Sequence, residues 1–258
     1  MKEFDPILQS CPLFDGVRPE DLSSILGCLG AKVIHIKKGR PVLREGDTPV
    51  FVGIVLTGSV QLLREDYYGN RSVVTHIGPT QLFGEAYAFS GAPSLPVSVV
   101  PDEDGEILLL DSRRITVRCS NACDFHNRVI FNLLRLVATK NLMLHQKIDV
   151  TSKRTTREKL MAYLLIQAKV HNSNTFTIPF DRQALADYLE VDRSGLSSEI
   201  SKLRKEGILE CEKSNFRLLL SQAPFARAAV LRRDLAVTRQ NVLRPKDFMA
   251  FCWFDGIR

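Results

Sequence analysis

The sequence predicts an α+β protein. An antiparallel β-roll (a double-stranded β-helix) comes first, a long helix follows, and a winged helix-turn-helix comes last. Three observations support this fold class. Apolar and polar residues alternate through much of residues 31–111, where glycines recur as turn signals. Apolar residues then follow a heptad pattern from Ile130 to Ile148. Finally, two short helical segments, each with its own N-cap, occupy Asp181–Leu203.

The composition is typical of a soluble globular protein. Of the 258 residues, 45% are hydrophobic and 25% are charged. No apolar run approaches the roughly 20 residues that span a bilayer, and the N-terminus MKEFDPILQS has no signal-peptide pattern. We therefore expect a cytoplasmic protein without a membrane partner. Its six scattered cysteines form no CxxC pair and are expected to be free thiols: Cys11, Cys28, Cys119, Cys123, Cys211 and Cys252.

Positive charge gathers toward the C-terminus. Residues 1–149 hold 16 basic and 17 acidic side chains, residues 150–220 hold 12 and 9, and residues 221–258 hold 7 and 3. A surface that faces phosphates needs such an excess, so the charge distribution favours a nucleic-acid partner for the C-terminal part.

Residues 1–123 are predicted to form the roll and a short helical lead-in. Leu22, Ile25, Leu26 and Leu29 have helical spacing, which places the lead-in at residues 5–29. Many short strands with frequent turn signals predict a sandwich or roll. The strands are expected near 32–36, 41–44, 51–56, 59–64, 72–77, 96–101 and 106–111.

Residues 124–150 are predicted to form one long helix that carries two apolar stripes. A single Asn141 at an a position of the heptad fixes register and favours a two-stranded coil, which predicts a parallel homodimer. The dimer seam comprises Ile130, Leu134, Val137, Asn141, Leu144 and Ile148. The second stripe is expected to face the roll and comprises Val129, Leu133, Leu136 and Met143. The alternative is a helix that packs only on its own domain.

Residues 151–220 are predicted to form a separate winged helix-turn-helix domain. Thr155 and Glu158 have capping-box spacing, so a helix should begin there and run to about Val170. TFTIPF is a predicted strand, Asp181 and Asp192 are N-caps of two short helices, and Gly207 ends the second. ILEC and FRLLL then flank EKSN and predict a two-stranded wing.

The outward face of the second short helix is the predicted DNA-contacting surface. Arg193 lies at its N-terminal end and can grip guanine O6 and N7 together. Glu190 occupies the turn position where glycine is usual. The predicted DNA-contacting residues are Arg193, Ser194, Ser197, Ser198, Gln183, Arg182, Lys202 and, at the wing tip, Lys213.

Residues 221–258 form a basic extension for which the sequence suggests no role. FARAAVLRRDLAVTRQNVL has the pattern of a basic amphipathic helix, and PKDFMAFCWFDGIR has no clear period. Docking on the dimer, binding of a partner and a poorly ordered extension all remain open.

Several motifs in this order resemble the cyclic AMP receptor protein and fumarate–nitrate regulator (Crp/Fnr) superfamily of bacterial transcription regulators. The motifs of the roll are KKGRPVLREGD, FVGIVLTGSVQLL and IGPTQLFGEAYAFSG, and those of the C-terminal domain are TTREKLMAYLL and RQALADYLEVDRSGLSSEISKLRKEGIL. The resemblance covers residues 10–220. It implies a cyclic-nucleotide-binding-like roll and a homodimer that binds a near-palindromic operator, with RNA polymerase as a further partner. It also places Arg193, Ser194 and Ser198 at base-reading positions and Gln183 at a phosphate contact.

The resemblance further implies an effector pocket in the roll. Members that bind cyclic nucleotides have Gly-Glu followed, ten residues after the Glu, by an Arg-Ser pair that clamps the phosphate. Here Gly84 and Glu85 match, but the pair is Leu95 and Pro96. Because an unclamped phosphate would lose charge-assisted bonds of about 1.5–3 kcal/mol each, we expect an effector other than cyclic AMP. The predicted pocket comprises Gly84, Glu85, Leu95, Pro96 and Val97, with Asn141 and His145 as its roof.

Three alternatives remain open at this stage. The pocket of the roll is packed shut and the roll is a scaffold, or the chain is a regulatory module that does not use DNA. A third alternative is a thiol-redox switch at Cys11, Cys119 and Cys123. We find no catalytic triad, paired-carboxylate site, metal motif or phosphate loop, so no enzymatic activity and no cofactor is expected.

Overall fold

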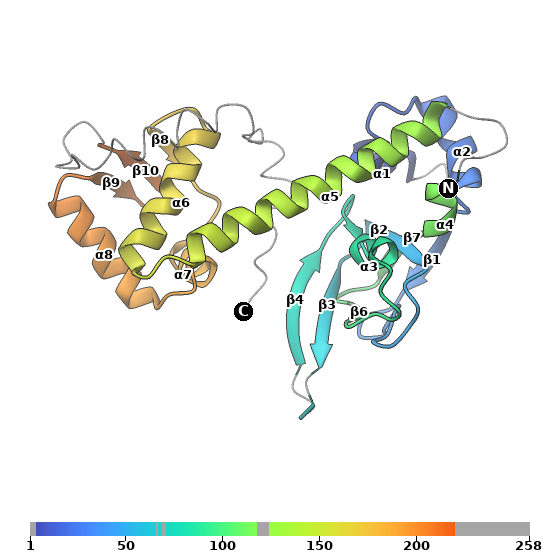
Figure 1. Ribbon diagram of the computed structural model, residues 1–258, viewed down its shortest axis with the longest axis horizontal. Coiled ribbons are helices and arrows are strands. Elements are labelled where there is room, and N and C mark those ends of the chain that lie inside the picture. Colours follow the sequence, from blue (N-terminus) through green and yellow to red (C-terminus); the bar gives the residue numbers. More distant parts are fainter. Residues whose placement is uncertain (1–3, 66, 69–70, 118–123, 220–258) are drawn as a thin grey trace. The chain divides into compact units, whose positions relative to one another are not determined.

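The computed structural model describes residues 4–65, 67–68, 71–117 and 124–219. These residues form two compact units, one that ends at Asn141 and one that begins at Leu142. The long helix α5, Asp124–Thr151, contributes to both units (Figure 1). The α+β fold class and the order of roll, long helix and helix-turn-helix are confirmed. The basic extension, Cys119 and Cys123 lie outside the described residues.

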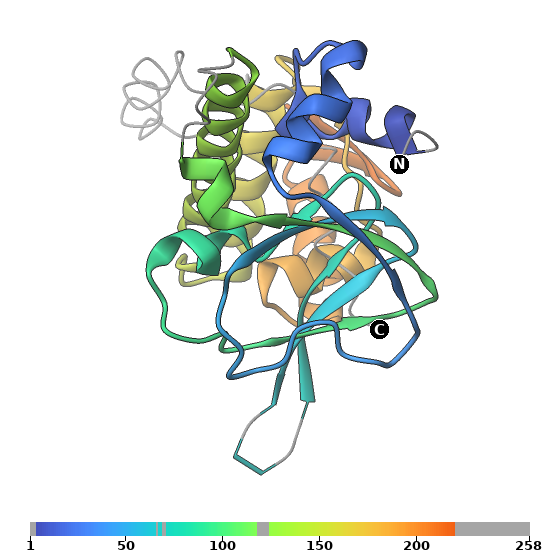
Figure 2. The same ribbon diagram turned by 90° about the vertical axis from the view of Figure 1, so that its right-hand side faces the viewer.

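The first unit opens with the predicted helical lead-in, which is divided into three short pieces: α1 (Asp5–Ser10), the 3₁₀ helix η2 (Pro12–Phe14) and α2 (Pro19–Cys28). Each piece has a proline in its first positions, where the missing N–H costs nothing. Leu22, Ile25, Leu26 and Leu29 are all buried, as predicted. Figure 2 shows these helices beside the first turns of α5, where Asn132 Nδ2 donates to the carbonyl oxygens of Leu13 and Asp15.

Two antiparallel sheets build the roll. One has the order β1-β7-β2-β5 and the other β4-β3-β6. The strands are β1 (Lys32–Ile36), β2 (Phe51–Thr57), β3 (Val60–Glu65), β4 (Arg71–Ile77), β5 (Leu82–Phe83), β6 (Ser98–Pro101) and β7 (Gly105–Asp111). Their inner faces meet in one core that includes Val55, Leu62, Phe83, Val97 and Ile107. Gly53 is required there, because a Cβ at this position would lie 2.0 Å from Phe83 Cζ.

Two predicted strands in the roll are wrong, and the prediction omits two short helices. Residues 41–44 form no strand and make only a single bridge, between Leu43 and Val99, because Pro41 has no N–H and Gly39 and Gly46 turn the chain on either side. The strand expected at 96–101 begins at Ser98, after Pro96. Two short helices, α3 (Glu85–Ser90) and α4 (Ser112–Thr116), follow strands and were not predicted.

The second unit is built from α6 (Thr156–Val170), α7 (Arg182–Leu189), α8 (Arg193–Lys205) and a small sheet (Figure 1). The Thr155–Glu158 capping box is present. The wing has three strands rather than the predicted two, since β8 (Thr175–Thr177) pairs with β10 (Asn215–Leu218), which also pairs with β9 (Leu209–Glu212). The core of this unit includes Val150, Leu164, Leu189, Leu196 and Phe216.

The turn between α7 and α8 places a non-glycine residue in the left-handed region. Glu190 has φ 53° and ψ 55°, and Val191 N–H donates to Ala186 O at 3.0 Å, which is the usual geometry of a glycine helix end. Glu190→Gly should therefore raise the free energy of unfolding by about 0.5–1 kcal/mol. Thermal and urea unfolding of the full chain measure this. Glu190→Ala is the control, because it removes the charge but keeps the Cβ; an equal gain with alanine would contradict the strain explanation.

Candidate DNA-binding surface and sensor site

The helix-turn-helix is held by two aspartate caps. Asp181 Oδ1 accepts from Ala184 N at 2.8 Å and starts α7, and Asp192 Oδ2 accepts from Gly195 N at 2.9 Å and starts α8. The inner faces of both helices are buried and comprise Leu185, Ala186, Leu189, Leu196, Ile200 and Leu203. Gly207, at φ 67°, ends α8, and Ile208 N–H donates to Leu203 O at 3.0 Å. Both N-caps and the C-terminal glycine are as predicted.

The outward face of α8 carries the predicted contact residues. The exposed ones are Arg193, Ser194, Ser197, Ser198 and Lys202. Within the described part of the chain, the Arg193 side chain makes no hydrogen bond or ion pair, so its guanidinium is available to a ligand. Lys202 Nζ lies 3.5 Å from Glu199 Oε2. An unengaged arginine at the start of an exposed, capped helix can donate to a guanine edge.

The other three predicted DNA-contacting residues lie outside α8, and they differ in exposure and in the contacts that hold their side chains. Gln183 is exposed at the start of α7, and its Nε2 donates to Asp187 Oδ1 at 2.8 Å. Lys213 is exposed at the turn between β9 and β10. Arg182 is half-buried, since its guanidinium lies 6.0 Å from the Phe216 ring and donates to Cys211 Sγ at 3.5 Å. Arg182 thus has a structural role in the wing that the sequence pattern did not indicate.

An ion-pair cluster that sequence reasoning missed joins α6 to the back of α8. Arg157 donates to Glu206 through both Nη atoms, with Nη1 to Oε1 at 3.0 Å, and its Nη1 lies 3.6 Å from Glu199 Oε1. The residues are 42 and 49 positions apart in sequence, so no short-range pattern could have found the cluster. It fixes the orientation of α8 on α6.

The cluster predicts a pH dependence of stability. Hydrogen bonds from Arg157 hold the pKa of Glu206 below its ordinary value, so Glu206 contributes stability above its unfolded pKa of about 4.3. That contribution is lost as the pH falls through the lower pKa of the folded state. Glu206→Gln should therefore lower the melting temperature at pH 7 and have a progressively smaller effect below about pH 4. Glu212→Gln, an exposed carboxylate of β9, is the control; equal effects of both variants at pH 7 would contradict the prediction.

The predicted sensor residues divide into buried and exposed groups. Leu95 and Val97 are packed inside the roll, whereas Pro96 is exposed. Gly84, at φ 81°, precedes α3, and Glu85 begins it. Asn141 and His145 are exposed on α5, one turn apart. Leu95 and Val97 are therefore part of the core.

Glu85 is buried, with 5% of its surface exposed, and has an internal cation as partner. Lys140 of α5 donates from Nζ to Glu85 Oε1 at 2.5 Å and to Leu82 O at 3.3 Å. Burying a carboxylate is costly unless it is paired, and Lys140 supplies that pairing. The pair also attaches α5 to the roll. No short sequence pattern predicts this pair, because the two residues are 55 positions apart.

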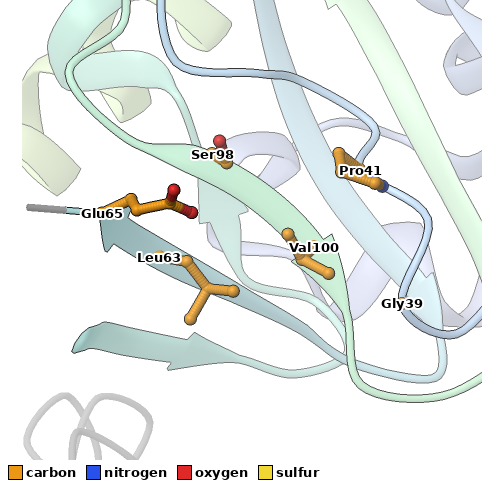
Figure 3. A pocket seen from close by; sticks show the side chains of 6 residues that line it. All are labelled: Gly39, Pro41, Leu63, Glu65, Ser98 and Val100. Atoms are coloured by element: carbon orange, nitrogen blue, oxygen red, sulfur yellow. The ribbon is translucent and has the colours of Figure 1, made fainter. Parts of the chain in front are cut away.

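A pocket of about 190 Å³ lies elsewhere on the roll. Figure 3 shows its lining: Gly39, Pro41, Leu63, Glu65, Ser98 and Val100. Leu62 and Val99 point into the core, so the alternation of strand side chains places Leu63, Ser98 and Val100 on the outer face of the β4-β3-β6 sheet. None of the predicted effector residues lines this pocket.

The two stripes of α5 differ in burial as predicted. Of the predicted roll-facing stripe, Val129, Leu133 and Leu136 are buried, whereas Met143 is half-buried. Most of the predicted seam is exposed, with exposed fractions of 66% for Leu134, 39% for Val137, 55% for Leu144 and 60% for Ile148. Ile130 is half-buried and Asn141 is exposed. Such an apolar row on a long helix is typical of a surface that a partner covers.

Cys11 has the environment of a structural cysteine. Burial raises the pKa of its thiol to about 12, so the reactive thiolate is scarce at neutral pH.

In the described ranges, no three His, Cys, Asp or Glu side chains are grouped as metal ligands. Among the same residues, no helix combines the length and apolar character needed to cross a bilayer.

Two domain families match this chain. Residues 33–120 match the cyclic nucleotide-binding domain, and residues 158–223 match the Crp-like helix-turn-helix domain. The transcriptional activator protein FnrL of Cereibacter sphaeroides is 26% identical over 184 residues, which cover 67% of this chain and 71% of FnrL. The cyclic AMP receptor protein of Thermus thermophilus is 29% identical over 103 residues, which cover 40% of this chain and 46% of that protein. The solved structure of the Thermus thermophilus catabolite activator protein has a TM-score of 0.43 and 23% identity, and covers 86% of this chain and 97% of that one.

Together, the two matched domains define a transcription regulator rather than an enzyme. The chain belongs to the Crp/Fnr superfamily of bacterial transcription regulators, and its helix-turn-helix is a DNA-binding element.

Proposed function

We propose that the protein is a sequence-specific transcription regulator that acts as a homodimer and responds to an effector other than cyclic AMP. The observation that carries the proposal is the exposed, unengaged Arg193 at the start of α8, a helix fixed by its aspartate cap and by Arg157. In this proposal α8 enters the major groove and Arg193 grips a guanine. RNA polymerase is the expected protein partner. The remaining proposed DNA contacts are Ser194, Ser197, Ser198, Gln183, Arg182, Lys202 and Lys213.

The exposed seam of α5 supports the dimer. Two copies aligned in parallel would bury Leu134, Leu144 and Ile148 and pair Asn141 with its counterpart. A two-fold dimer presents two copies of α8 to half-sites about 34 Å apart, which is one turn of DNA. The operator is therefore proposed to be near-palindromic.

The sensor site argues against cyclic AMP as the effector. Its phosphate would lie beside Leu95 and Pro96, which offer neither a cation nor a hydroxyl, and Glu85 is already paired with Lys140. A ligand that displaced Lys140 would alter how α5 is attached to the roll, which gives an effector a route to the dimer helix. We propose a small organic molecule that acts at Gly84, Glu85 and the turn of α5 that carries Lys140 and Asn141.

A thermal-shift titration tests the effector claim. A ligand at 100 times its Kd raises the free energy of unfolding by about 2.7 kcal/mol, which is readily measured as a shift in Tm. Cyclic AMP is expected to leave the Tm unchanged up to millimolar concentration. A saturable increase in Tm that is lost in Glu85→Gln would contradict this part of the proposal.

Selection from random duplex DNA tests the DNA-binding function. The full chain at physiological salt should enrich a short motif that contains a guanine in each of two inverted half-sites. Enrichment of no motif, with binding that depends only on salt, would overturn the proposed function.

A further inference from the structure

The serine hydroxyls of α8 differ in the acceptor to which each one donates. Ser194, Ser197, Ser198 and Ser201 are all exposed. Ser194 Oγ donates to Asp192 Oδ2, Ser197 Oγ donates to Arg193 O at 2.9 Å, and Ser201 Oγ donates to Ser197 O at 2.9 Å. The Ser198 hydroxyl makes no hydrogen bond among the described residues. A hydroxyl has one proton and two acceptor lone pairs, so Ser194 and Ser197 have only acceptor capacity left.

The bond from Ser194 is the most firmly held of the three. Its acceptor is the Asp192 carboxylate, which also accepts from Gly195 N at 2.9 Å as the cap of α8. The Ser194 hydroxyl and then the Gly195 amide hold the pKa of Asp192 below its ordinary value, so the acceptor is charged at neutral pH. Hydrogen bonds to a carboxylate are stronger than neutral ones, and the N-terminus of a helix favours the negative charge.

We infer that Ser194 and Ser197 read DNA as hydrogen-bond acceptors, and that they select amino bases, adenine or cytosine, over keto bases on the strand they face. The inference rests on the proposed function, since α8 must lie in the major groove. There adenine N6 and cytosine N4 donate, whereas guanine O6 and thymine O4 accept. Arg193 has donors only and reads guanine. On the same helix, Arg193 therefore reads base atoms that accept hydrogen bonds, whereas Ser194 and Ser197 read base atoms that donate them.

Reading a keto base would require Ser194 to withdraw its proton from Asp192. The carboxylate oxygen would then lose a partner at a position close to the phosphates of the bound duplex, where negative charge is unfavourable. The hydroxyl proton of Ser197 is held less strongly, because its acceptor is the neutral backbone carbonyl of Arg193, which also accepts a hydrogen bond within the helix. The preference for amino bases should therefore be stronger at the position facing Ser194.

Base selection by the full chain and four variants tests the inference. The parent should enrich amino over keto bases about three- to tenfold at positions next to the guanine read by Arg193. Ser194→Ala and Ser197→Ala should each remove the preference at one position. Asp192→Asn keeps a good cap but removes the charge, and should relax only the position that faces Ser194. Ser201→Ala, which removes an exposed hydroxyl of α8 outside the predicted DNA contacts, is the matched control and should leave both amino preferences unchanged.

Three outcomes would overturn the inference. The first is enrichment of keto bases by the parent at the positions next to the guanine read by Arg193. The second is a motif that stays unchanged in both Ser194→Ala and Ser197→Ala. In both cases the parent still selects a motif, so the proposed function stands. A parent that selects no motif overturns the proposed function as well. Circular dichroism and Tm confirm that each variant is folded, which exposed Ser→Ala changes in a helix should not prevent.

Discussion

Arg193→Ala is expected to abolish sequence-specific DNA binding and leave the fold and the dimer intact. Each bidentate guanine contact is worth about 1–3 kcal/mol of discrimination, and a dimer makes two of them, so about 2–6 kcal/mol should be lost. The fold should not change, because the Arg193 side chain is exposed and makes no hydrogen bond or ion pair among the described residues. Fluorescence anisotropy on the selected duplex measures the affinity, and sedimentation measures the dimer.

Arg204→Ala is the matched control for charge. Arg204 is exposed on the last turn of α8, far from the end that meets base edges, and its loss removes the same positive charge. Its expected effect is a small and uniform weakening on all sequences. If Arg204→Ala lost as much specific affinity as Arg193→Ala, general electrostatics rather than base reading would explain the binding.

Leu144→Glu is expected to convert the dimer into monomers. Leu144 is 55% exposed in one chain, so the change should barely affect the fold of that chain. In the paired helices it would place two carboxylates opposite each other in a desolvated seam, and a buried unpaired charge costs several kcal/mol. Sedimentation velocity should show the monomer mass. Affinity for a two-half-site duplex should fall to that for a single half-site.

Leu142→Glu supplies the same chemical change outside the seam. Leu142 is 43% exposed on α5, two residues from Leu144, but lies at position b of the heptad. The Leu142→Glu variant should remain dimeric. A monomeric Leu142→Glu, or a dimeric Leu144→Glu, would show that the helix pairs through another face or not at all.

The parts of the fold that sequence predicts well are those with local causes. Asp181 and Asp192 act within three residues as helix caps, and the period of Val129, Leu133 and Leu136 is enough to identify the buried face of α5. Glycine is usual at the position of Glu190 because the backbone there is left-handed, and the φ of 53° shows this directly.

The remaining features depend on contacts between distant positions. The Glu85–Lys140 pair and the Arg157–Glu206 pair join different elements, so no short pattern contains them. The third strand of the wing depends on β8 meeting β10 in space. The donor state of Ser194 depends on a side-chain rotamer, which composition and spacing cannot supply.

The measurement that tests the central claim most directly is the stoichiometry and footprint of the full chain on the selected duplex. We expect two chains per duplex and two protected segments with centres one helical turn apart, about 34 Å. We also expect both segments to lose protection together when the guanines of one half-site are replaced. One chain per duplex, or protection that does not follow the sequence, would contradict a homodimeric, sequence-specific regulator.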